Sequence, residues 1–237
     1  MTDPFGRAIR DVHRGEQSEP LWTVDGDERL EHPIERFYFV ERDDEVYETL
    51  DADGLATPLL DLGAGAGRDV LRFQERYDGE AVGLEPSAHL VETMRERGVD
   101  RAVEGDMFAL RESFGRDRFR GVYAHGTQLG LARPPHRLRA FLADLAFVTD
   151  ADAVAVLDNY DPGADGASDL LGWRPDPTPG TGYRVMHFEY EGDVGETLLF
   201  RPFTPDVLRD ACVGSAWTVD GIRYSNDHHY EAVLHKE

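Results

Sequence analysis

A glycine-rich loop constrains the fold of this chain more than any other feature of the sequence. The segment Asp61-Leu62-Gly63-Ala64-Gly65-Ala66-Gly67 overlaps the end of an apolar run over 59–62 and precedes a helical apolar pattern over 68–77. Glycines between a strand and a helix let the backbone turn sharply and let a ligand approach the main chain closely. The loop therefore predicts a strand–loop–helix unit with a ligand near the helix N-terminus.

Strand and helix patterns alternate through the next hundred residues. Further strands are expected at 81–84, 101–103, 121–124 and 153–157, with helices after Ser87 and from 134 onward. Strands that alternate with helices indicate an open, mostly parallel sheet with helices on both faces. With two late strand candidates, 219–224 and 230–234, the sequence predicts an α/β, Rossmann-like sheet of seven strands.

Two additions frame this predicted sheet. Residues 1–57 are polar and irregular, with a short helical pattern near 33–50, and we expect an N-terminal lid ahead of a ligand-binding domain over 58–237. The Gly/Pro-rich stretch 161–182 is expected to be a long loop, followed by a β-hairpin built from 183–190 and 196–200. A last helix is expected after Thr204.

The charge balance excludes several classes of partner. Lys+Arg total 25 against 47 Asp+Glu, so the formal net charge is −22, and Lys236 is the only lysine. This acidity argues against nucleic acid, which needs a basic face. Acidity with almost no lysine resembles the proteins of salt-loving microbes, where concentrated salt screens self-repulsion. We therefore expect a halophilic protein.

Cysteine usage and hydropathy bear on the cellular setting. A single cysteine, Cys212, allows neither an intrachain disulfide nor a thiolate zinc cluster. No apolar run approaches the ~18 residues of a membrane span. The first residues lack the basic-then-apolar layout of a signal peptide. These features predict a cytoplasmic protein with no membrane partner.

The spacing of the glycine loop discriminates between ligands. The dinucleotide fingerprint G-x-G-x-x-G would require a third glycine where Arg68 stands, whereas the observed pattern is G-x-G-x-G with Asp61 two residues before it. A carboxylate at that position suits a cationic amino group better than a pyrophosphate. S-adenosylmethionine (SAM) carries such a group, together with a sulfonium and an adenosine.

At these residues the sequence resembles the class I SAM-dependent methyltransferases. Asp61, Gly63, Gly65 and Gly67 match their first motif. The resemblance implies that Asp61 serves the ammonium end of SAM, directly or through water, while the glycine backbone lines the methionine and ribose. It covers residues 59–160 well and extends weakly toward the C-terminus.

Two further motifs of that family follow in order. Glu85, with Pro86 after it, ends the second predicted strand and matches the acid that accepts hydrogen bonds from both ribose hydroxyls. Asp106 and Met107 match a third motif, in which the acid takes the adenine amino hydrogens and the next residue meets the ring. Asp106 alternatively caps a helix that begins near Met107.

The end of the fourth predicted strand resembles the family's fourth motif. The resemblance implies that the backbone there, including that of His125, binds the methionine part of SAM, while the side chains face the acceptor. His125 is the best candidate to position or deprotonate the acceptor. Tyr123, two residues earlier, and Asp158, at the end of the fifth strand, are the other catalytic candidates. His187 and the pair 228–229 have no carboxylate at metal-ligand spacing, so we expect them to be solvated or packed and expect no metal site.

The acceptor class follows from features that the sequence lacks. The fourth-strand segment does not match the N/D-P-P-Y tetrapeptide of amino-methyltransferases, and Cys212 lies far from the predicted cleft, unlike the nucleophile of C5-methyltransferases. The two additions resemble lids of small-molecule methyltransferases, so we expect a small-molecule acceptor. A non-catalytic SAM-binding protein and an NAD(P)-dependent oxidoreductase remain alternatives.

Overall fold

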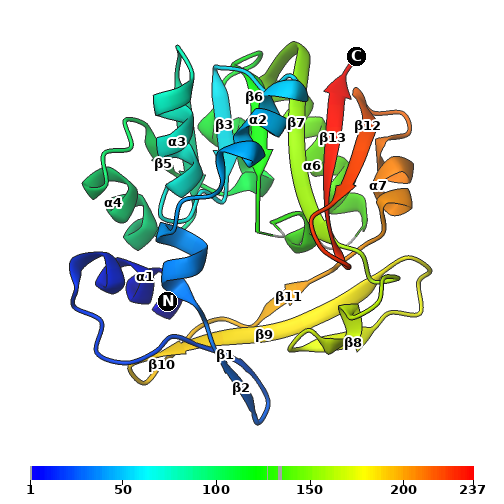
Figure 1. Cartoon of the computed structure of the whole chain (residues 1–237). Coiled ribbons are helices and arrows are strands. Elements are labelled where there is room, and N and C mark those ends of the chain that lie inside the picture. Colours follow the sequence, from blue (N-terminus) through cyan, green and yellow to red (C-terminus); the bar gives the residue numbers. More distant parts are fainter. Residues whose placement is uncertain (1, 127, 133–134) are drawn as a thin grey trace.

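A seven-stranded sheet forms the centre of the molecule (Figure 1). The computed structural model describes residues 2–126, 128–132 and 135–237. The strand order is β12-β13-β7-β6-β3-β4-β5. The strands are β3 (Leu59–Leu62), β4 (Ala81–Glu85), β5 (Ala102–Glu104), β6 (Phe119–Ala124), β7 (Thr149–Tyr160), β12 (Trp217–Tyr224) and β13 (His229–Lys236). β3 to β7 pair in parallel and the last two are antiparallel, which confirms the predicted Rossmann-like sheet.

Helices cover both faces of this sheet because its strands are apolar on both sides. The first face carries α2 (Asp44–Ala52), α3 (Arg68–Arg76) and α4 (Ala88–Glu96), and the second carries α5 (Leu110–Ser113), α6 (Pro135–Val148) and α7 (Pro205–Cys212). Neighbouring residues of β6 show the alternation: Val122 packs in the cluster with Leu142 of α6, and Tyr123 packs in the cluster with Phe73 of α3. Short helical turns are η1 (Glu35–Phe39), η2 (Met107–Ala109), η3 (Gln128–Leu131) and η4 (Ala167–Asp169).

A second, antiparallel sheet lies outside the main one. Its strands are β1 (Trp22–Asp25), β2 (Glu28–Glu31), β8 (Trp173–Pro175), β9 (Gly182–Tyr190), β10 (Asp193–Val194) and β11 (Leu198–Phe200). β9 is its central strand and pairs with β1, β8, β10 and β11. The N-terminal addition and the hairpin insertion thus join in one sheet.

The sequence reading of these two additions was wrong in detail. Residues 1–57 are not irregular, because they contain α1 (Pro4–Arg14), β1 and β2, and the expected loop at 161–182 contains η4 and β8. β1 pairs with β9, a strand more than 150 residues later, with Thr23 opposite Phe188. Strands of three or four residues carry too short a pattern to be recognised without such a partner.

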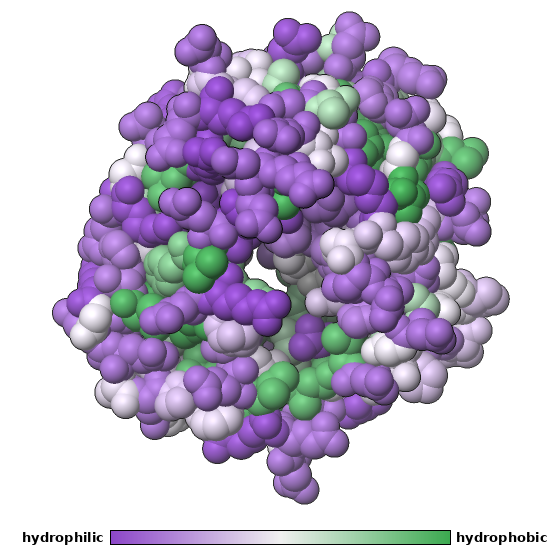
Figure 2. Space-filling model, in the orientation of Figure 1, coloured by the Kyte–Doolittle hydropathy of each residue, from purple (hydrophilic) through white to green (hydrophobic). Residues whose placement is uncertain are grey.

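The second sheet lies across the carboxyl ends of the parallel strands (Figure 1). Alternate residues of β9, namely Met186, Phe188 and Tyr190, pack in one apolar cluster with Ile9 of α1 and with Leu21. Figure 2 shows a hollow that passes between the two layers, and the site described below lies on the main-sheet side of this space. In the described part of the chain, no helix is long and apolar enough to cross a membrane.

Candidate functional site

The glycine loop turns from β3 into α3 through left-handed backbone conformations. Gly63, Gly65 and Gly67 have φ values of 67°, 57° and 79°, which side-chain-bearing residues rarely adopt. A Cβ at Gly65 would lie 3.1 Å from the ring of Tyr38, and one at Gly63 would lie 2.6 Å from the side chain of Gln128. The glycines therefore leave the main chain bare where other segments approach it.

Glu85 closes this loop from the neighbouring strand. Its carboxylate is buried, with one oxygen accepting the Gly65 amide at 3.1 Å and the other accepting the Ser87 amide at 3.1 Å. Burial raises the pKa of Glu85 to about 7, although the two amide hydrogen bonds act in the opposite direction. Each oxygen keeps a second lone pair, so the carboxylate can accept two further donors.

Asp61 is buried at the end of β3, beside Glu85. Burial and the nearby Asp69 carboxylate raise the pKa of Asp61 well above its usual range, and the Arg68 guanidinium offsets part of this shift. The side chain of Asp69 is engaged separately, because it accepts the Tyr47 hydroxyl at 2.7 Å. A cationic ligand group beside Asp61 would favour its ionised form.

The third motif continues the same edge of the sheet. Asp106 follows β5 by two residues and is exposed, and its Oδ1 accepts the Phe108 amide at 2.8 Å, so it caps η2. Met107 is buried, whereas Pro86 is exposed at the neighbouring turn. Asp61, Glu85 and Asp106 therefore occupy the ends of three adjacent strands.

Tyr38 of the N-terminal addition lies over the glycine loop. Its hydroxyl lies 3.2 Å from the Nε2 atom of His32, whose own pKa is lowered to about 4 by burial and by the Arg184 cation. The ring of His32 in turn packs edge-on against Phe188 of β9. The second sheet thus holds Tyr38 in place. Tyr47, the other tyrosine of the N-terminal addition, does not face this loop and belongs to the core between α2 and α3.

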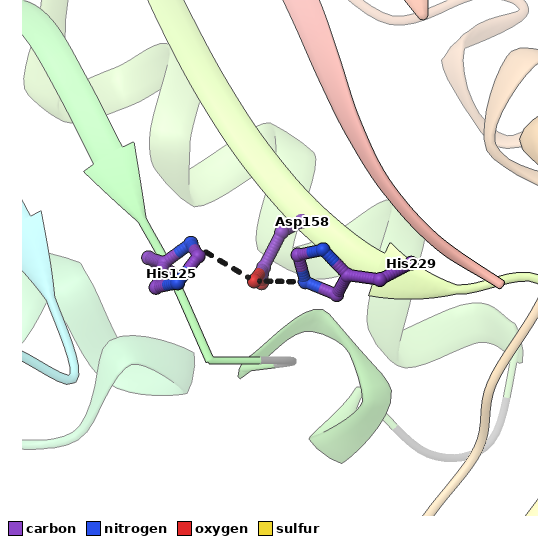
Figure 3. Close-up of side chains that lie close together, drawn as sticks. All are labelled: His125, Asp158 and His229. Atoms are coloured by element: carbon purple, nitrogen blue, oxygen red, sulfur yellow. Dashed lines mark hydrogen bonds and ion pairs between the residues drawn. The ribbon is translucent and has the colours of Figure 1, made fainter. Parts of the chain in front are cut away.

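A buried carboxylate joins two histidines at the ends of β6, β7 and β13 (Figure 3). Asp158 Oδ2 lies 2.8 Å from His229 Nε2 and 3.4 Å from His125 Nδ1, and it accepts the Gly126 amide at 2.7 Å. His229 Nδ1 lies 2.6 Å from Ser225 Oγ. Burial alone would raise the pKa of Asp158, but His229, the charge of His125 and the Gly126 amide bring it below its usual value.

His125 is the solvent-accessible member of this cluster. Its side chain is 28% exposed against 10% for His229, and its second ring nitrogen points away from Asp158 (Figure 3). Burial lowers the pKa of His125, and the Asp158 charge offsets part of that shift. A neutral imidazole with one nitrogen beside a carboxylate and the other directed away can accept a proton from a neighbour.

Tyr123 packs against the His125 ring of this cluster. Its ring is buried and stacks parallel to the His125 ring at a centroid distance of 6.1 Å. Its hydroxyl accepts a hydrogen bond from Arg42, and burial raises the pKa of Tyr123 well above its usual value. The contacts of Tyr123 therefore support the His125 ring, and its hydroxyl is directed toward Arg42.

His229 is the member that sequence spacing missed. Asp158 precedes it by 71 residues, so no local pattern joins the two. The antiparallel pairing of β13 with β7 places His229 opposite Tyr160, on the strand next to the one that carries Asp158. Both strands have polar residues where they meet, and this signal was available in the sequence. It can be used only when the strand order that makes β7 and β13 neighbours is known.

The same three side chains are a candidate metal-ligand set. Their ligand atoms lie within 4.8 Å of one another. The Gly126 amide and His229 already direct hydrogen bonds at Asp158 Oδ2, which has two lone pairs. These contacts favour a proton-transfer network, and a metal ion would have to displace them.

The fold and the strand-end carboxylates define a Rossmann-like protein with a nucleotide-type site at the carboxyl edge of its sheet. A family model described as a methyltransferase domain matches residues 59–151. This part of the chain, which contains the glycine loop and the parallel strands β3 to β6, is therefore similar to a methyltransferase domain. No curated protein matches the sequence.

Solved structures share the fold at low sequence identity. A SAM-dependent methyltransferase from Bacteroides fragilis, in complex with S-adenosylhomocysteine, is 19% identical, with a TM-score of 0.78 over 98% of this chain and 94% of that one. CalS10, an amino pentose methyltransferase from Micromonospora echinaspora, is 18% identical, with a TM-score of 0.56 over 82% and 91%. The 1,6-didemethyltoxoflavin N1-methyltransferase of Burkholderia thailandensis is 16% identical, with a TM-score of 0.58 over 100% and 91%.

Proposed function

We propose that this protein transfers the methyl group of SAM to a small-molecule acceptor by direct displacement. The observation that carries the proposal is the buried Glu85 carboxylate, held by the Gly65 and Ser87 amides at the tip of β4, beside the left-handed glycine loop. This arrangement leaves acceptor lone pairs for two vicinal hydroxyls. The acceptor class is supported by the methyltransferases named above and by the second sheet that covers the cleft.

In this proposal the cofactor is bound by the strand-end carboxylates. Asp61 would bind the ammonium group, Glu85 the ribose hydroxyls, and Asp106 with Met107 the adenine. The backbone of Gly63, Gly65 and Gly67 would line the methionine and ribose, with Pro86 at the rim. The buried position of Asp61 fits a cationic partner, because the unpaired carboxyl has a raised pKa.

Bound SAM supplies a methyl group already activated by the sulfonium, so this chain's own residues mainly align the acceptor. The acceptor atom donates an electron pair to the methyl carbon as the carbon–sulfur bond breaks. Where that atom carries a proton, His125 accepts it at the nitrogen directed away from Asp158. Asp158 stabilises the resulting imidazolium, His229 holds Asp158 in place, and the Tyr123 ring stacks on the His125 ring.

Replacing His125 tests this assignment. His125→Ala should lower the turnover of labelled SAM by about 10²–10⁴-fold if the histidine is a general base. The dissociation constant of S-adenosylhomocysteine should stay within about twofold, since the alanine removes no proposed cofactor contact. His187→Ala is the matched control, because His187 contacts Glu189 on the second sheet, outside the cluster.

Two further measurements separate the competing explanations. Turnover that is unchanged in His125→Ala would remove His125 from the mechanism. Turnover that EDTA abolishes and one divalent metal restores would contradict the metal-free proton-transfer role of the cluster. Failure of the wild-type protein to bind S-adenosylhomocysteine would contradict the proposed function itself.

A further inference from the structure

Arg184 is an arginine in the covered space between the two sheets without a carboxylate partner. It lies on β9, at an even-numbered position like the buried residues Met186 and Phe188, so its side chain leaves the inward face of the second sheet. Its Nε donates to the Leu171 carbonyl oxygen at 2.8 Å. Among the described residues, no Asp or Glu forms an ion pair with it. This isolation is unusual in a chain with 47 acidic residues against 25 basic ones.

The surroundings of Arg184 place it between the cofactor side and the acceptor side of the site. Its positive charge lowers the pKa of His32, which lies beside Tyr38 over the glycine loop. The same charge favours a lower pKa for Tyr160 at the end of β7. The ring of Tyr160 packs edge-on against His229 of the histidine cluster. The guanidinium therefore lies within electrostatic reach of groups from both halves of the proposed active site.

Arg184 is half-buried and loses part of its water contact, and no described carboxylate compensates for that loss. Burial lowers the pKa of Arg184 below its usual value, which reflects that loss of hydration. Even partial desolvation of a guanidinium is offset when an anion pairs with it, and its planar fork matches a carboxylate or phosphate through two parallel hydrogen bonds. The hydrogen bond to Leu171 uses Nε, and no other described residue bonds the two terminal nitrogens, which can therefore bind a ligand.

The neighbours on β9 indicate the rest of the ligand. In the register of the second sheet, Arg184 is opposite Trp173 of β8 and Phe200 of β11, and cross-strand partners project from the same face. The Phe200 ring lies 3.4 Å from a Cβ built at Gly130, so this face contacts the main domain. Aromatic rings beside a cation suit a flat molecule with an anionic end.

We propose that Arg184 binds an oxyanion on the methyl acceptor, so that the substrate is an anionic, flat small molecule whose carboxylate or equivalent group pairs with this guanidinium. The inference rests on the proposed methyltransferase function. It explains how the second sheet selects the acceptor: β9 binds the anionic end, while the reacting atom lies near His125. Arg184 is thus a specificity residue and takes no part in the displacement.

The test uses benzoate as the anionic probe and benzamide as its neutral counterpart. Each is titrated calorimetrically into the full-length protein saturated with S-adenosylhomocysteine, at one constant ionic strength. We expect benzoate to bind at least about tenfold more tightly than benzamide. Arg184→Met should lose this preference, and Arg184→Lys should recover part of it, since lysine keeps the charge but not the planar fork.

Arg174→Met is the matched control, because Arg174 belongs to the adjacent strand β8 but pairs with Asp25 and is half exposed. It should keep the preference for benzoate. The inference is overturned if the wild type does not bind benzoate up to about 50 mM, if it binds benzamide equally well, or if Arg184→Met retains the benzoate affinity. Cofactor binding is measured first, so a protein that binds S-adenosylhomocysteine but not benzoate contradicts the Arg184 assignment alone.

Discussion

In the proposed site, the raised pKa of Glu85 should make cofactor affinity depend on pH. With a pKa of about 7 in the free protein, half of the Glu85 carboxyls are protonated at neutral pH. The ribose hydroxyls of the proposed complex would donate to the ionised form, so binding should release that proton. The dissociation constant then scales as 1 + 10^(pKa − pH), which makes binding about fivefold weaker at pH 6 than at pH 7. Asp61 adds an effect of the same sign, because its pKa is also raised.

Calorimetry measures both consequences directly. S-adenosylhomocysteine is titrated at pH 6 and pH 7 in buffers of different ionisation heat, and the buffer dependence gives the protons released, about 0.5 from Glu85 at pH 7. Glu85→Gln should bind more weakly and lose the share of the pH dependence that Glu85 contributes. Glu104→Gln is the matched control, because Glu104 is exposed and lies opposite Glu85 on β5. An affinity that is equal at the two pH values, or a Glu85→Gln variant with the wild-type pH dependence, would refute the reasoning.

Two further predictions concern the glycine loop and the acidic surface. Gly65→Ala should weaken S-adenosylhomocysteine binding by about tenfold or more, because its φ of 57° is strained for alanine and the added methyl lies 3.1 Å from Tyr38. Gly98→Ala carries backbone strain at a φ of 94° with no atom within 4 Å of the methyl, so it should lower stability and leave affinity unchanged. An equal loss of affinity in both variants would show that strain alone acts. For the surface, raising KCl from about 0.1 M to about 2 M should raise the melting temperature on the order of 5 °C, since salt screens the repulsion of 22 excess negative charges; a melting temperature that falls over this range would count against a halophilic protein.

The main sheet could be predicted from the sequence because its signals are local. The strands predicted between 59 and 160 are short runs, the first four of which precede a helix, and every such run became a strand of the parallel part of the sheet. The glycine loop follows β3 directly, Glu85 is the last residue of β4, and Asp106 follows β5 by two residues. Parallel strands end at one edge, so strand-end residues become neighbours by topology alone.

The second sheet and the histidine cluster could not be predicted in the same way. β1 and β9 meet only through the folded chain, and the four residues of β1 have no recognisable pattern without that partner. His229 contacts Asp158 because β13 inserts between β7 and β12, a strand order that no short segment encodes. The proposal for Arg184 likewise needed the structure, in which no described Asp or Glu pairs with this arginine.

The amino-acid sequence by itself determined the class of fold and the residues at the carboxyl edge of the sheet, because backbone freedom at glycine and apolar periodicity act over a few residues. Only the tertiary structure decided which distant side chains face one another across the cleft. Coulomb forces and desolvation act through space, so the pKa values of Glu85, Asp158 and His125 depend on neighbours brought close by folding.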